Sequence, residues 1–80
     1  MEPDWAGLEK LLRSMTVVNL RKLGRTWFMG ALGGASTKRD IAQEMVAQMR
    51  HWWRSCADNG GRERVDDVLR DIVRLAGDAE

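Results

Sequence analysis

The segment TKRDIAQEMVAQMRHWWRSC, residues 37–56, determines the fold class. Its apolar residues recur every three or four positions, which is the spacing of one face of an α-helix. A second apolar row runs beside the first, so the predicted helix has a wide apolar face that must pack against other elements. The first row is Ile41, Met45, Met49, Trp52 and Cys56, and the second is Ala42, Val46 and Trp53.

Both ends of this helix carry start and stop signals. Ser36 or Thr37 is expected to begin it, and Thr37 followed by Asp40 is a weaker form of the capping box. The turn Asp58-Asn59-Gly60-Gly61 is expected to end it, with a glycine as the C-cap. These signals predict one long helix between two loops.

Two shorter amphipathic helices are predicted before this segment. The first runs from Pro3-Asp4 to about Ser14, with Pro3 in the first turn, where its missing N–H is not needed. The second begins with Thr16 as its N-cap, and its end stays open because Gly24 weakens a helix by roughly 1 kcal/mol. The apolar stripe of the first is Trp5, Leu8, Leu11, Leu12 and Met15, and that of the second is Val17, Leu20, Leu23 and Trp27.

The stretch MGALGGA, residues 29–35, separates the second helix from the long one. Three glycines in seven residues favour an extended loop over a helix. The loop is unusually apolar, and we expect Leu32 to insert into the core and hold it in place.

A fourth amphipathic helix is predicted over about residues 62–75. No segment shows the sustained alternation of a strand, so the sequence predicts one all-α domain over residues 1–80. Its architecture is a compact bundle of about four helices with a Gly-rich extended loop between the second and third. In the fourth helix we expect Val65, Leu69, Ile72 and Val73 to face inward, Val68 and Leu75 to lie at the margins, and Asp66, Asp67, Arg70, Asp71 and Arg74 to face water.

Reactive side chains are scarce in this chain. Cys56 has no second cysteine for a disulfide or a zinc site, and His51 is the only histidine. We therefore expect a non-enzymatic protein with no cofactor, no metal and no small-molecule substrate. No apolar stretch approaches the roughly 20 residues of a membrane span, and the acidic start of the chain differs from a secretory signal. A cytoplasmic location without membrane contact is expected.

The net charge is only +1, but the charges are segregated along the sequence. Residues 1–9 carry three acids and no base, and residues 10–54 carry nine Lys or Arg against two acids. Residues 55–80 carry four Arg against seven acids. A basic middle between acidic ends is compatible with ordinary solvated helix faces, and it is also what a local contact with an anionic partner requires.

Residues 16–49 contain a recognisable motif pattern. The stretch TVVNLRKL, residues 16–23, opens a short helix, a Gly-rich loop with Leu32 follows, and STKRDI, residues 36–41, begins the next helix. This order resembles the helix–extended loop–helix module of SAP domains and of the N-terminal region of transcription terminator Rho. Their pattern is T-V-x-x-L-[KR]-x-L, then an apolar loop residue, then G-x-K-x-[DE]-[LI]. Here Ser36 stands at the glycine position, and the stretch before Leu32 is a few residues longer.

The resemblance implies binding to the backbone of DNA or RNA. Free N–H groups at the start of the third helix favour an anion, and two basic side chains stand at the same place. Three more basic residues on the preceding helix extend the surface. Such contacts hold phosphates and position a protein without reading bases. The candidate residues are Arg21, Lys22, Arg25, Lys38 and Arg39.

A second group of residues favours a protein partner instead. Trp52 and Trp53 are adjacent on one helix, and Arg50 and Arg54 flank them. Trp and Arg are enriched at interface hot spots. The two tryptophans could instead pack between helices, or form a stacking platform for unpaired bases. The helix order is also similar to death-domain-like or effector-associated adaptor modules and to small phage-type inhibitors of host proteins. Oppositely charged faces could pair between copies, which would give a homo-oligomer.

Overall fold

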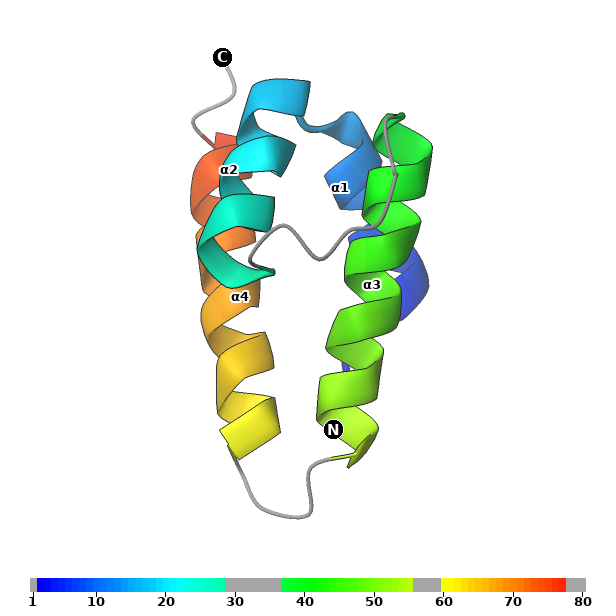
Figure 1. Ribbon diagram of the computed structural model, residues 1–80, viewed down its shortest axis with the longest axis vertical. Helices are drawn as coiled ribbons and strands as arrows, with labels where there is room; N and C mark the ends of the chain where they lie inside the picture. The colour runs from blue at the N-terminus through cyan, green and yellow to red at the C-terminus, as the bar shows by residue number, and fades with distance from the viewer. Residues whose placement is uncertain (1, 29–36, 56–59, 78–80) are drawn as a thin grey trace.

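The long helix is the centre of the fold. The computed structural model describes residues 2–28, 37–55 and 60–77, and in these ranges it contains α1 (Trp5–Ser14), α2 (Val17–Trp27), α3 (Lys38–Ser55) and α4 (Gly60–Gly77). α3 packs against the other three helices, and α2 also packs against α4 (Figure 1). The described part of the chain has no strand, so the all-α bundle predicted from the sequence is confirmed.

Side-chain caps define where three helices begin. Thr16 accepts a hydrogen bond from the backbone N–H of Asn19 at 3.2 Å, and Thr37 accepts one from that of Asp40 at 3.1 Å. Both predicted caps are confirmed. The prediction for Pro3 is wrong, because Asp4 is the N-cap of α1 and the helix begins one residue after it. The Asp4 carboxylate accepts a hydrogen bond from the backbone N–H of Gly7 at 3.1 Å. The side chain of Pro3 has no acceptor atom that could do the same.

Removal of the Thr16 cap is expected to weaken α2. The Thr16→Ala variant leaves the Asn19 N–H without its partner, and we expect a loss of about 0.5–2 kcal/mol in the free energy of unfolding. Thr26→Ala is the matched control, since the Thr26 hydroxyl donates only to the carbonyl of Lys22 within the same helix and caps nothing. Urea unfolding of both variants checks this. Equal losses would contradict a specific role for the cap.

α2 continues through Gly24 to Trp27, which settles the end that the sequence left open. Gly24 is buried, and the N–H of Phe28 donates to its carbonyl at 3.0 Å. Burial of the helix face against α3 and α4 compensates for the low helix propensity of one glycine. Because α2 continues this far, Trp27 lies in its last turn.

α4 differs from the prediction at its start and in its inward face. Gly60 and Gly61 form its first turn and do not cap α3, because the buried packing of the helix overrides their weak propensity. Val73 was expected inside but is 65% exposed, whereas Val68 is fully buried. The buried face follows the spacing 3-4-3, through Val65, Val68, Ile72 and Leu75.

The core gathers apolar side chains from all four helices. The described residues include no buried polar or charged side chain, and no described helix is long and apolar enough to cross a membrane. The expectations for the 29–35 loop with Leu32, for Ser36, for Cys56 and for the Asp58-Asn59 turn lie outside the described residues. The buried core residues are Leu8, Leu12, Met15, Leu20, Leu23, Phe28, Ile41, Ala42, Met45, Val46, Met49, Val65, Val68, Ile72 and Leu75.

Candidate nucleic-acid interface

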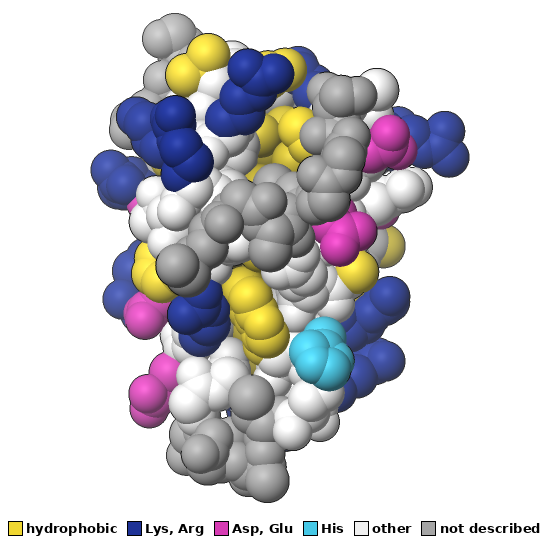
Figure 2. Space-filling view, viewed as in Figure 1, with side chains coloured by type: hydrophobic (Ala, Val, Ile, Leu, Met, Phe, Trp, Pro, Cys, Tyr) yellow, Lys and Arg dark blue, Asp and Glu magenta, His cyan; other side chains and the backbone are white. Residues whose placement is uncertain are grey.

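The five basic residues singled out in the sequence all have exposed side chains. Arg21, Lys22 and Arg25 lie on α2, where positions 21 and 25 are one helical turn apart. Lys38 and Arg39 are the first two residues of α3, so they stand beside the backbone N–H groups that a helix leaves without intrahelical partners. On the face seen in Figure 2, Lys and Arg side chains gather over the upper part of α2 and again at the upper end of α3.

Helix directions bring the starts of α2 and α3 to one end of the molecule, whereas Arg25 lies in the last turn of α2. α2 and α3 both begin at the end that is uppermost in Figure 1. α1 runs antiparallel to α3, since Trp5 contacts Trp53 near the C-terminal end of α3. Arg13, in the last turn of α1, therefore lies at the same end. Arg13 was not among the basic residues predicted from the sequence, because only the antiparallel packing brings the end of α1 to this place.

Most other arginines are engaged within the protein. Arg54 pairs with Glu2 at 2.7 Å, which lowers the pKa of the Glu2 carboxyl below its ordinary value. Arg70 pairs with Asp67 at 3.6 Å, and Arg74 pairs with Asp71. By contrast, none of the five candidate residues forms an ion pair with any residue that the structure describes. Within the described residues, no carboxylate neutralises these charges through a direct ion pair.

The adjacent tryptophans of α3 are half-buried and have partners inside the chain. The ring of Trp52 stacks on Phe28 with centroids 5.2 Å apart, and that of Trp53 meets Trp5 edge to face at 6.4 Å. Two guanidinium groups of α4 cover them: the Arg64 group lies 4.6 Å from the Trp52 centroid and the Arg62 group lies 5.0 Å from that of Trp53. No local pattern in the sequence predicts these contacts, which join residues far apart in the chain. Of the flanking arginines predicted with the pair, Arg50 is exposed and Arg54 makes the ion pair described above.

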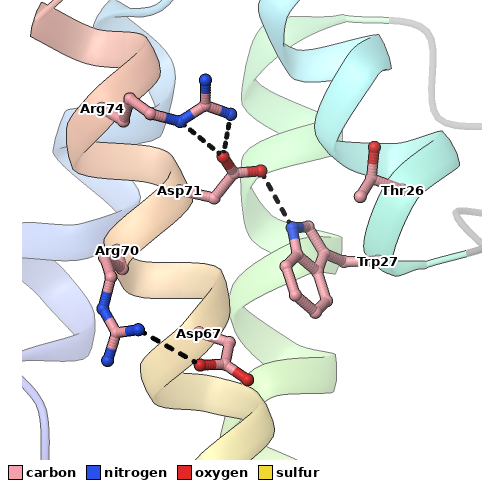
Figure 3. A pocket seen from close by; sticks show the side chains of 6 residues that line it. All are labelled: Thr26, Trp27, Asp67, Arg70, Asp71 and Arg74. Carbon is pink, nitrogen blue, oxygen red and sulfur yellow. Dashed lines mark hydrogen bonds and ion pairs between the residues drawn. The ribbon is translucent and has the colours of Figure 1, made fainter.

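An open cleft of about 480 Å³ lies between α2 and α4 (Figure 3). Trp27 extends from α2 toward α4, and its indole N–H donates to the Asp71 carboxylate at 3.0 Å. Arg74 binds the other oxygen of that carboxylate. Asp71 was expected to face water, but its side chain is only 17% exposed. The residues that line the cleft are Thr26, Trp27, Asp67, Arg70, Asp71 and Arg74.

The cleft carboxylate is held in its charged form. The hydrogen bonds from Arg74 and then from the Trp27 N–H lower the pKa of Asp71 below its ordinary value of 3.8, and the positive charge of Lys22 acts in the same direction. Lys22 and Thr26 are one turn apart on α2, where the Thr26 hydroxyl donates to the Lys22 carbonyl. A cation of the candidate interface therefore lies one helical turn from a residue that lines the cleft.

Stability is expected to depend on pH through Asp71. Because its folded pKa is below 3.8, the unfolded chain takes up the proton first as the pH falls. The stabilisation is present above the unfolded pKa and is lost as the pH falls through the folded pKa. Asp71→Asn, which keeps an oxygen acceptor for Trp27, should lose about 0.5–1 kcal/mol at neutral pH and show a flatter decline below pH 4 or so. Urea midpoints across acidic pH measure this, and parallel curves would contradict it.

Among the residues described, no group of three or more His, Cys, Asp or Glu side chains is placed to hold a metal ion. No protein-family model, curated protein or solved structure matches this chain.

Proposed function

We propose that this chain is a non-catalytic module that binds the phosphate backbone of DNA or RNA through the exposed cations of α2 and of the α3 start. The observation that carries the proposal is a group of exposed cations without ion pairs on α2 and at the start of α3. Arg21, Lys22, Arg25, Lys38 and Arg39 have no ion-pair partner in the described structure. The same is true of Lys10, Arg13 and Arg50, whereas five other arginines are bound to carboxylates or lie over tryptophan rings.

Two further features support the same reading. The first turn of α3 presents backbone N–H groups beside two cations, which is a favourable arrangement for a phosphate. The resemblance of residues 16–49 to SAP domains and the Rho N-terminal module implies the same kind of ligand. Asp40 and Glu44 lie on α3 as well, so we expect moderate affinity confined to the basic end, and we expect the chain to act in the cytoplasm.

The test is a binding titration of the whole chain with a labelled duplex and a labelled single strand of the same sequence at several salt concentrations. If all five cations contact phosphates, the logarithm of the association constant should fall against the logarithm of salt concentration with a slope of about −4.5 for the duplex and about −3.5 for the single strand. Fewer contacts give a proportionally shallower slope.

Absence of binding to either probe at low salt would overturn the proposal. The protein-partner alternative, with Arg50, Trp52, Trp53 and Arg54 as the surface and either another protein or a second copy of the chain as the partner, would then take its place. Binding that does not change with salt would also contradict a phosphate site.

A further inference from the structure

Trp27 differs from the other three tryptophans of the chain. Trp5, Trp52 and Trp53 each contact another aromatic ring, and arginines cover the last two. The Trp27 ring has no aromatic or guanidinium partner among the described residues, yet its N–H is fixed to Asp71. Its indole is thus held in one orientation and lines an open cleft (Figure 3).

The charges of the side chains that line this cleft cancel, and a positive side chain lies one helical turn from one of them. Two arginines and two aspartates line it, and they pair with each other across one helical turn. Such a lining has little attraction for a phosphate but offers hydrogen-bond donors and acceptors to a neutral polar ring. Lys22, which has no ion-pair partner in the described structure, lies on α2 one turn before Thr26, and Thr26 lines the cleft. A neutral planar group with a phosphate attached next to it fits this arrangement.

We propose that the cleft takes an unpaired base of a single-stranded nucleic acid, with the base stacked on Trp27 and a neighbouring phosphate on Lys22. The inference rests on the proposed function and narrows it, because the bases of a duplex have their faces covered by stacking and cannot enter. Stacking on an aromatic side chain tolerates any base, since every base has a π-face. The hydrogen bond to Asp71 orients the ring before the ligand arrives, which reduces the ordering needed on binding.

The experiment compares three labelled probes at fixed low salt: a single strand, its duplex, and an abasic strand of the same length. The abasic strand keeps every phosphate and removes every base. The whole chain should bind the single strand roughly 5- to 150-fold more tightly than the abasic strand, and more tightly than the duplex. Trp27→Leu should bring the ratio of the single-strand affinity to the abasic-strand affinity close to one, whereas Trp27→Phe should retain most of this preference. Trp53→Leu is the matched control, and it should leave the ratio unchanged.

A second measurement does not depend on variants that fold. Single strands carrying bromouracil should crosslink to Trp27 of the unmodified protein on irradiation, as peptide mass spectrometry would show. Two results would contradict base binding in the cleft: salt-dependent binding with equal affinity for ordinary and abasic strands, or crosslinks only at residues other than Trp27. Either result would still be consistent with the phosphate interface. No binding to any of the three probes would overturn the proposed function and the pocket together.

Discussion

The double variant Lys38→Glu, Arg39→Glu is expected to lose nucleic-acid binding while it keeps its helical content. Each charge-assisted contact to a phosphate contributes about 1.5–3 kcal/mol, so removal of two should weaken binding at low salt by roughly 100-fold or more. The salt slope should also fall by about 1.8 for a duplex. Acidic residues are favourable in the first turn of a helix, so α3 itself should not be weakened. The titration described above and far-ultraviolet circular dichroism measure the two effects.

The control for this variant is Arg50→Glu, Arg54→Glu. It makes the same change in net charge on the same helix, but toward the C-terminal end of α3 and away from the proposed site. We expect a small reduction in affinity, caused by the altered overall charge. Equal losses from both double variants would mean that net charge alone governs binding, and unchanged binding of the first would remove the α3 start from the interface.

Leu20→Ala is expected to produce a large loss of stability. Leu20 is fully buried in the core, and truncation of such a leucine removes its apolar contacts and leaves a cavity, which together cost about 2–5 kcal/mol. A domain of 80 residues typically has about 4–12 kcal/mol of stability in total. The variant should therefore lose a large part of its stability, and urea unfolding should show a lower midpoint.

Val18→Ala provides the comparison within the same helix. Val18 lies two positions before Leu20 but is 69% exposed, so its truncation should change stability by no more than about 0.5 kcal/mol. A similar shift in midpoint for both variants would contradict the orientation of α2 described above.

Local sequence signals predicted the helices well because their causes are local. The apolar spacing in residues 37–56 and the hydroxyls of Thr16 and Thr37 act within one or two turns of chain. The inward face of α4 was harder to predict, since apolar residues at 65, 68, 69, 72, 73 and 75 form a stripe wide enough for two orientations. Packing against α2 and α3 selected the one that buries Val68 and exposes Val73.

For the candidate site too, some features could be predicted from the sequence and others could not. The exposure of Lys38 and Arg39 follows from their place in the first turn of an amphipathic helix, so the sequence could indicate it. The pairing of Trp27 with Asp71 could not be predicted, because the two residues are 44 positions apart and no periodic pattern links them. The guanidinium groups over Trp52 and Trp53 also arise only when α4 docks on α3.

The tryptophans lie where helices meet, so their near-ultraviolet signals depend on helix packing. Trp5 with Trp53 spans α1 and α3, Trp52 with Phe28 spans α3 and the end of α2, and Trp27 with Asp71 spans α2 and α4. Three helix junctions thus contain an indole chromophore with a distinct neighbour. Near-ultraviolet circular dichroism of single-tryptophan variants can therefore follow the undocking of each helix separately, without labels, and reveal the order in which the bundle comes apart.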